Sequence, residues 1–270
     1  MNATAFALLA AFLYLLTSAG LAMRLGGCES SLCASRKLVF LPGFGAVILH
    51  AIVLYPELVT GQGFNFGFFN AASLTALLTV ALLLLVATWQ PVESLAIPLL
   101  PVAATTLGLA AIYPSQQAIS STSWQLDVHI LFSVLAYSLF VLAAVQAALL
   151  AIQERHLRNR QPGRFVRALP PLQVMEKLLF QMIGTGFILL TIALLSGFFF
   201  LDDIFAQHLV HKTSLSIAGW IIFGVLLWGR WRFGWRGRTA IRWTLSGFAL
   251  LILAYFGSKL VLELIMAGNA

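Results

Sequence analysis

Five histidines are the side chains of this sequence best suited to bind a metal. They are His50, His129, His156, His208 and His211. An imidazole nitrogen binds haem iron as well as zinc and copper. An ionisable side chain in an apolar segment is costly to bury and is therefore a candidate site. The histidines are thus the first residues whose positions must be explained.

Other motifs for catalysis or covalent attachment are missing from the sequence. The two cysteines, Cys28 and Cys33, form neither a Cys-x-x-Cys-His nor a Cys-x-x-Cys motif, so covalent c-type haem attachment is not expected. We find no hydrolytic triad, no paired-carboxylate site and no Gly-rich phosphate loop. We therefore expect a binding protein and not an enzyme.

The composition indicates which kind of structure positions the histidines. Of the 270 residues, 60% are hydrophobic and 9% are charged, whereas a soluble domain carries roughly 25% charged residues. The mean hydropathy is +0.95. So few charges cannot cover a water-facing surface, and most of the surface must face lipid. We predict an all-α fold, a polytopic membrane helical bundle.

Eight apolar runs are long enough to cross a bilayer, which takes roughly 20 residues. They lie near 3–23, 38–57, 66–88, 93–113, 126–152, 177–201, 212–229 and 239–262. No soluble domain, repeat or low-complexity tract separates them. We expect one integral membrane domain over residues 1–270.

Basic residues alternate along the connections between these runs. Twelve of the sixteen Lys and Arg residues lie in the first, fifth and seventh connections: Arg24, Arg36, Lys37, Arg155, Arg158, Arg160, Arg164, Arg167, Arg230, Arg232, Arg236 and Arg238. Such residues are retained on the cytoplasmic side. The pattern predicts periplasmic termini in a bacterial inner membrane and argues against nucleic-acid binding. The basic stretch 153–176 could also dock a membrane or cytoplasmic protein partner.

In this topology four histidines converge on the outer leaflet. His50 lies seven residues before Glu57, roughly 10 Å below the outer boundary. His129 opens the fifth run, and His208 and His211 precede the seventh. Only His156 falls in a cytoplasmic connection, where a solvated side chain is the simplest interpretation.

Aromatic residues gather at the same outer side. They are Phe64, Phe66, Phe68, Phe69, Trp124, Phe198, Phe199 and Phe200. They could wall a haem pocket, or they could form an interfacial belt. The acids Asp127, Asp202 and Asp203 could accept a hydrogen bond from a ligating histidine, or lie exposed in loops. Lys212 and Lys259 could meet haem propionates or lipid phosphates.

Three segments resemble the cytochrome c assembly family, which includes the CcsA/ResC, CcmC and HemX-like proteins. Ser123-Trp124, Asp127-Val128-His129 and Tyr137 are similar to the family's entry into a helix. Gly234-Trp235-Arg236-Gly237, followed by Gly247-Phe248 and Tyr255-Phe256-Gly257, resembles its C-terminal helix. Leu49-His50 with Asn70 is similar to its N-terminal portion. The compact, eight-span YpjD/HemX-like branch is the most similar in length and pattern.

The resemblance implies a non-covalent b-type haem. His50 and His129 would be its axial iron ligands, His211 a substitute or second site, and Trp124 and Tyr137 further cofactor-binding residues. Two departures argue against delivery of haem to apocytochrome c. The connection between the sixth and seventh runs lacks the Trp-rich motif of the transporting members, and Trp228 stands where those members tend to carry a histidine.

Three functions remain open from the sequence. The favoured one is a haem-binding protein that handles or senses haem at the periplasmic leaflet. The alternative is a non-catalytic accessory or regulatory partner of a transporter or tetrapyrrole-pathway protein, with a vestigial haem site. A redox protein passing electrons between haem and quinone is disfavoured, because the histidines crowd one leaflet.

Overall fold

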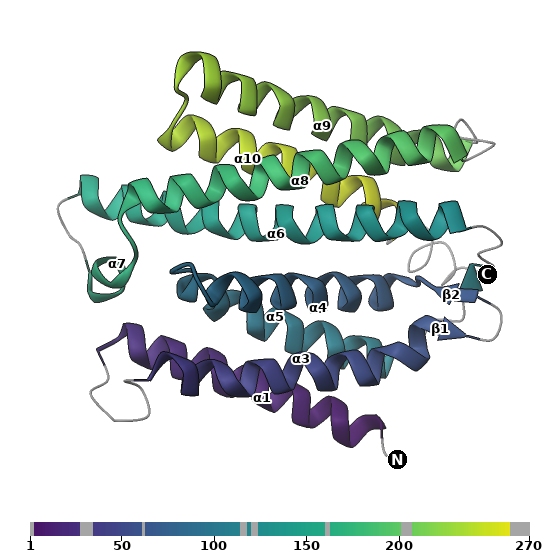
Figure 1. Ribbon diagram of the computed structural model, residues 1–270, viewed down its shortest axis with the longest axis horizontal. Helices are drawn as coiled ribbons and strands as arrows, with labels where there is room; N and C mark the ends of the chain where they lie inside the picture. The colour runs from purple at the N-terminus through teal and green to yellow at the C-terminus, as the bar shows by residue number, and fades with distance from the viewer. Residues whose placement is uncertain are drawn as a thin grey trace. The chain divides into compact units, whose positions relative to one another are not determined.

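The protein is described by a computed structural model that covers residues 3–27, 35–60, 63–113, 118–119, 124–159, 163–200 and 207–259. Within these residues eight helices are long and apolar enough to cross a membrane. Figure 1 labels them: α1 (Ala3–Leu25), α3 (Arg36–Leu58), α4 (Phe68–Ala87), α5 (Glu93–Ile112), α6 (Trp124–Arg158), α8 (Leu172–Phe200), α9 (Gln207–Phe233) and α10 (Gly237–Ile252), which continues as the π-helix η1 (Leu253–Gly257). The all-α polytopic fold predicted from hydropathy is confirmed.

The helices extend beyond the predicted apolar runs at several ends. Helix α6 continues to Arg158 instead of stopping near residue 152, and α8 begins at Leu172 instead of near 177. The last turn of α6 carries Arg155, His156 and Arg158. Cations at a helix C-terminus interact favourably with its dipole, so the basic segment prolongs the helix.

The chain forms two compact units. Unit 1 contains residues 1–120 and 161–170, and unit 2 contains residues 121–160 and 171–270. Unit 1 therefore holds α1, α3, α4, α5 and the short helix α7 (Arg164–Ala168), while unit 2 holds α6, α8, α9, α10 and η1. That the chain acts as one membrane domain stays a prediction.

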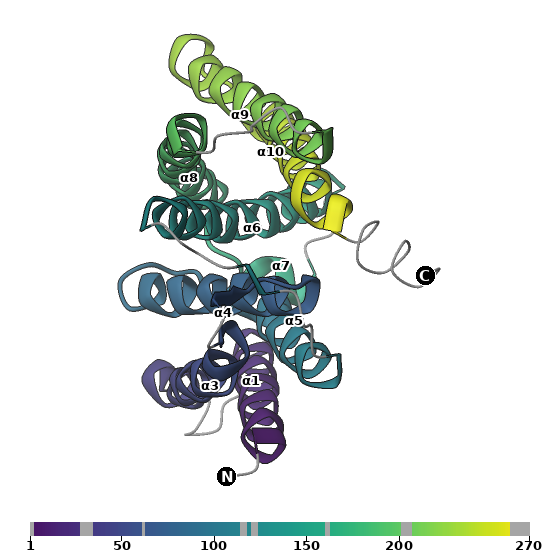
Figure 2. The ribbon, with the colours of Figure 1, turned by 90° about the vertical axis from the view of Figure 1, so that its right-hand side faces the viewer.

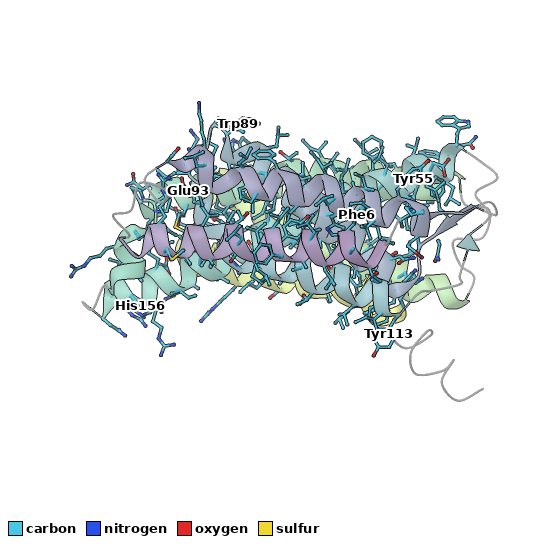
Figure 3. The ribbon with its side chains drawn as sticks, turned by 90° about the horizontal axis from the view of Figure 1, so that it is seen from below. Phe6, Tyr55, Trp89, Glu93, Tyr113 and His156 are labelled. Atoms are coloured by element: carbon cyan, nitrogen blue, oxygen red, sulfur yellow. The ribbon has the colours of Figure 1, made fainter. Side chains whose placement is uncertain are left out.

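Small side chains let the helices of unit 1 approach each other closely. Ala7 and Ala10 of α1 pack with Val53 of α3 and Leu107 of α5. Small residues at such contacts are the usual basis of helix packing in lipid, where hydrophobic burial between helices gives little driving force. Figure 3 shows Glu93 and Trp89 at one end of this unit, and Tyr55 and Tyr113 at the other.

A small antiparallel sheet, not predicted from the sequence, caps the Tyr55 and Tyr113 end of unit 1. It consists of β1 (Val59–Thr60), β2 (Gly63–Asn65) and β3 (Ala118–Ile119), in the order β1-β2-β3. Phe64 pairs with Val59 on one side and with Ile119 on the other. The sheet thereby joins the α3–α4 connection to the chain that follows α5.

Unit 2 has an aromatic core, and Figure 2 shows its helices obliquely. Phe140 of α6 stacks on Phe223 of α9 with ring centroids 4.1 Å apart, and both side chains are fully buried. Phe187 of α8 stacks on Trp220 of α9 at 5.4 Å. The indole Nε1 of Trp220 also donates a hydrogen bond to Thr191 Oγ1 at 2.9 Å, which satisfies its polar edge inside the bundle.

Two glycines with left-handed backbone make the turn from α9 into α10. Gly234 has φ +67° and Gly237 has φ +52°, a region that costs other residues about 1–2 kcal/mol. The Gly237 N–H donates to Glu176 Oε1 of α8 at 2.7 Å. A Cβ atom at Gly229 would lie 2.4 Å from the Trp235 ring. The Gly-Trp-Arg-Gly segment is thus a tight turn, and its Trp235 ring packs directly against the backbone of α9 at Gly229.

Candidate functional site

His129 of α6 is held by the last turns of α8. Its Nδ1 lies 2.8 Å from the backbone oxygen of Ala193 and 3.2 Å from Ser196 Oγ. The Ser196 hydroxyl itself donates to the Ala193 oxygen at 2.9 Å. Ala193 and Ser196 are buried, and His129 is half-buried. The ring therefore has a fixed orientation at the start of the fifth span.

These contacts determine which ring nitrogen is available for other chemistry. A carbonyl oxygen only accepts hydrogen bonds, so Nδ1 must carry the proton and donate it. In a neutral imidazole Nε2 then keeps its lone pair. Within the part of the chain that the structure describes, Nε2 makes no hydrogen bond. A ring whose Nδ1–H is held by a carbonyl and whose Nε2 is a free base is the usual arrangement of a histidine that binds a metal.

His50 of α3 has a different environment in unit 1. It is fully buried, with Nδ1 3.1 Å from the Tyr14 hydroxyl of α1 and Nε2 2.8 Å from Ser73 Oγ of α4. Tyr14 and Ser73 are fully buried as well. Both ring nitrogens are therefore satisfied by neighbouring helices, which is how a polar side chain is tolerated in the centre of an apolar bundle.

The two predicted axial ligands thus belong to different units, each with its own hydrogen-bond partners. Three other predicted cofactor-binding residues belong to unit 2. Trp124 is the first residue of α6 and is largely exposed, at 67%. The Tyr137 hydroxyl donates to the Leu251 backbone oxygen, and its ring lies against Tyr255 and Phe256. His211 lies in α9, but its side chain is outside the described part of the chain.

The predicted aromatic wall divides into packed and exposed members. In unit 1, the ring centroids of Phe64 and Phe66 are 5.9 Å apart, and Phe69 stacks on Tyr113 with ring centroids 5.2 Å apart. These rings pack on each other near the small sheet. In unit 2, Phe198 and Phe199 are 66% and 71% exposed, as expected for rings that face lipid.

Several other predicted residues have simpler surroundings. Asp127 is exposed, and Lys259 Nζ lies 5.4 Å from the centroid of the Tyr255 ring. His156 is exposed and its Nδ1 lies 2.9 Å from the oxygen of Ile152, one turn earlier. Cys28, Cys33, Asp202 and Asp203 and the side chain of His208 lie outside the described residues. Among the residues that are described, no group of three or more His, Cys, Asp or Glu side chains could hold a metal ion.

The sequence reasoning missed the partners of both histidines. Tyr14 and Ser73 are polar residues inside apolar helices, and this is a signal that could have marked them as neighbours of a buried histidine. Ala193 contributes only its backbone oxygen. Every residue has a backbone oxygen, so the residue type gives no indication of such a partner. The orientation of His129 therefore could not be predicted from the sequence.

Charged residues are paired at one end of unit 1. Glu93 Oε1 lies 2.8 Å from Arg36 Nε, and Glu93 Oε2 lies 3.6 Å from Arg24 Nε. Arg36 also donates to the backbone oxygens of Ala87 and Gln90 at 2.6 and 2.7 Å. The first basic connection is thereby fastened to the hairpin between α4 and α5.

The fold defines a polytopic membrane protein, and one of its histidines, His129, has its Nδ1 held by a backbone carbonyl. The chain belongs to the Cytochrome C assembly protein family, whose family model matches residues 38–266. The matched region includes His50, His129 and the Gly-Trp-Arg-Gly turn. The family predicted from these segments is confirmed.

Relatives extend the match over nearly the whole chain. The inner membrane protein YpjD of Escherichia coli strain K12 is 32% identical over 264 residues, which are 96% of this chain and 98% of YpjD. The cytochrome c biogenesis protein CcsA of Trichodesmium erythraeum is 28% identical over 33% of this chain and 26% of its own length. Protein HemX of Brevibacillus brevis is 25% identical over 52% of this chain and 53% of its own.

No solved structure matches the chain. The eight spans and the YpjD match confirm the predicted location as a multi-pass protein of the inner membrane.

Proposed function

We propose that this protein binds a b-type haem non-covalently through Nε2 of His129 and handles or senses haem at the periplasmic leaflet. The observation that carries the proposal is the hydrogen bond from His129 Nδ1 to the Ala193 backbone oxygen at 2.8 Å. It leaves the second ring nitrogen as an available base. The cytochrome c biogenesis role named for the CcsA relative gives the proposal its context, and a binding role without catalysis is part of it.

The residues around His129 suit such a ligand. The carbonyl of Ala193 and the hydroxyl of Ser196 hold one edge of the ring, and such outer partners typically raise ligand affinity 10–100-fold. When bound, the haem supplies an iron that accepts imidazole nitrogen and changes oxidation state. The chain's own part is to orient the ring and to keep Nδ1 protonated.

His50 is proposed as the second axial ligand, but at a cost. Its Nε2 bonds to Ser73 and its Nδ1 to Tyr14, so ligation must break one of these contacts. Leaving a buried polar group unpaired costs about 1–3 kcal/mol. His211 is kept as a substitute ligand, and Trp124 and Tyr137 as further contacts of the haem. The outward orientation of these residues and of both termini rests on the alternation of basic connections.

The test is a visible absorption spectrum of detergent-purified protein, oxidised and then reduced with dithionite. We expect a Soret band and sharp reduced α and β bands for the wild type. His129→Ala should abolish them, and the matched control His156→Ala should not, since His156 is exposed at the other end of the same helix. A wild-type spectrum without these bands after expression with ample haem rejects the proposal.

A second candidate is a non-catalytic accessory or regulatory protein with a vestigial haem site. The saturation of both His50 nitrogens by Tyr14 and Ser73 favours it, because that histidine already has a structural role. This candidate predicts no stoichiometric haem in the purified protein. Its partner would then be a protein docked on residues 153–176.

A further inference from the structure

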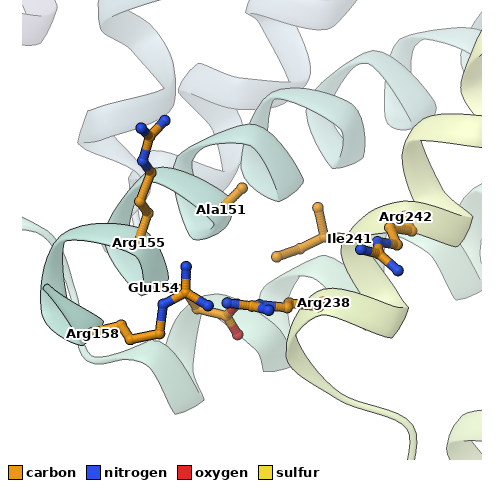
Figure 4. A pocket seen from close by; sticks show the side chains of 7 residues that line it. All are labelled: Ala151, Glu154, Arg155, Arg158, Arg238, Ile241 and Arg242. Atoms are coloured by element: carbon orange, nitrogen blue, oxygen red, sulfur yellow. The ribbon is translucent and has the colours of Figure 1, made fainter.

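A pocket in unit 2 collects arginines from two helices that are distant in sequence. It lies between the C-terminal end of α6 and the start of α10 and has seven lining residues, shown in Figure 4. They are Ala151, Glu154, Arg155, Arg158, Arg238, Ile241 and Arg242. Four arginines and one glutamate therefore line one hollow, and in Figure 4 the Arg158 and Arg238 side chains lie beside Glu154.

The helical spacing explains how the four arginines converge. Arg155 and Arg158 are three residues apart on α6, and Arg238 and Arg242 are four apart on α10, so each pair shares one face of its helix. The two helices pack against each other. Like charges at these spacings repel and destabilise a helix. All four arginine side chains are exposed, so water and salt screen part of this repulsion. A bound negative group would offset the rest.

The chain supplies too little negative charge for this purpose. Among the residues that the structure describes, none of the four guanidinium groups has a hydrogen-bond or ion-pair partner. Glu154 is in electrostatic range of Arg238, but its carboxylate is packed against the backbone of Gly237, where an added Cβ would lie 2.5 Å from Oε1. Glu176, whose carboxylate accepts the Gly237 N–H, is in electrostatic range of Glu154. Four arginines and these two glutamates leave two formal positive charges.

The basic end of unit 1 gives a useful contrast. There Arg24 and Arg36 share Glu93 within 3.6 and 2.8 Å. Retention of charge on the cytoplasmic side requires basic residues only in the connections. It does not require them to line a common pocket without partners, and Arg242 lies inside α10 and not in a connection.

We propose that this pocket binds the phosphate group of an anionic phospholipid. Guanidinium groups bind phosphate through paired N–H donors, and basic pockets between membrane helices on the cytoplasmic side suit anionic lipid headgroups. The pocket lies at the ends of two membrane-spanning helices. Ala151 and the buried Ile241 add apolar lining. A lipid fits this mixture better than free phosphate, which needs no apolar contact.

The experiment is native mass spectrometry of the detergent-purified chain, titrated with phosphatidylglycerol or with phosphatidylcholine of the same acyl chains. We expect saturable binding of phosphatidylglycerol and much weaker binding of phosphatidylcholine. The double variant Arg158→Gln, Arg238→Gln should weaken phosphatidylglycerol binding about 30-fold, since each lost charge contributes about fivefold. The control Lys37→Gln, Arg167→Gln removes two exposed charges that do not line the pocket, and it should change binding less than about twofold.

The variant Arg158→Lys, Arg238→Lys keeps the charge and tests the pocket even if the glutamine variant fails to fold. It should retain phosphatidylglycerol binding in preference to phosphatidylcholine, with a moderate loss of affinity. Equal losses in the pocket and control variants would overturn the proposal. So would displacement of the lipid by millimolar inorganic phosphate, which would identify free phosphate as the ligand.

Discussion

The Nδ1 atom of His129 lies 2.8 Å from the backbone oxygen of Ala193, so helix α8 fixes the protonation pattern of a side chain on helix α6. A backbone acceptor at this position cannot be lost by substitution of its side chain. The orientation of the imidazole is therefore protected against most mutations of α8. What remains open to mutation is the second contact, with Ser196.

Substitution of Ser196 tests how much its hydroxyl contributes beside the Ala193 carbonyl. In Ser196→Ala the carbonyl still accepts the Nδ1–H, so we expect haem affinity to fall by about tenfold or less, at the low end for an outer partner. Haem titration followed at the Soret band measures this. The control is Ser258→Ala, which removes a hydroxyl bonded to its own helix. Complete loss of binding in Ser196→Ala would show that the serine, and not the carbonyl, is the main acceptor.

The Tyr14–His50–Ser73 contacts should stabilise unit 1. Tyr14→Phe and Ser73→Ala each leave one buried ring nitrogen without a partner, and we expect each to lower the free energy of unfolding by roughly 1 kcal/mol, a value typical of hydrogen bonds inside membrane bundles. Unfolding in sodium dodecyl sulfate measures it. Tyr55→Phe is the control, because Tyr55 is 66% exposed. Because Tyr14 and Ser73 contact the same His50 ring, the losses in free energy of unfolding should not add in the double variant. Strictly additive losses would contradict these hydrogen bonds.

Glu93 should contribute to the stability of unit 1 through its ion pairs with both Arg24 and Arg36. Glu93→Gln weakens the contacts at 2.8 and 3.6 Å to Arg36 and Arg24, and we expect a loss of about 1 kcal/mol, the upper range for partly exposed ion pairs. The exposed Glu57→Gln is the control. High salt should reduce the difference in free energy of unfolding between Glu93→Gln and the wild type, because salt screens exposed charges. A loss that is independent of salt would point to packing instead.

A side chain at Gly237 should destabilise the turn before α10. Gly237→Ala places a Cβ 2.5 Å from Glu154 Oε1 at φ +52°, and we expect a loss of about 2 kcal/mol or more, hence a Tm lower by several degrees. Gly108→Ala, with nothing within 4 Å of the added Cβ, should be neutral or stabilising by up to about 1 kcal/mol. Tryptophan fluorescence on heating in detergent compares them. Equal Tm values for the two variants would contradict the left-handed turn between α9 and α10.

The spans could be predicted because length and hydropathy express directly what a bilayer demands of a helix. The family could be predicted because three segments, among them Gly234-Trp235-Arg236-Gly237, resemble those of the family. In the structure Gly234 and Gly237 of that segment hold backbone angles that few other residues adopt. The three-stranded sheet could not, since strands of two or three residues leave no periodic signal.

The candidate site was predictable only in part. His129 was identified by its type and its place at the start of a span, whereas its backbone partner depends on how α6 packs on α8. For His50, the polar type of Tyr14 and Ser73 could mark them as neighbours of a buried histidine, but it does not indicate which ring nitrogen each one contacts. Contacts between helices distant in sequence decide such details, and residue spacing along one helix does not encode them.

The division of the chain into two units has a consequence for its biosynthesis. The four membrane helices of unit 1 come from one uninterrupted stretch that ends before residue 121. Domains generally fold in order of their emergence from the ribosome. The chain up to Ser120 therefore contains every membrane helix of unit 1, and these can assemble in the bilayer before the last helices of unit 2 have been translated. The segment 161–170, with α7, reaches unit 1 only after α6 has been made, so it completes that unit late.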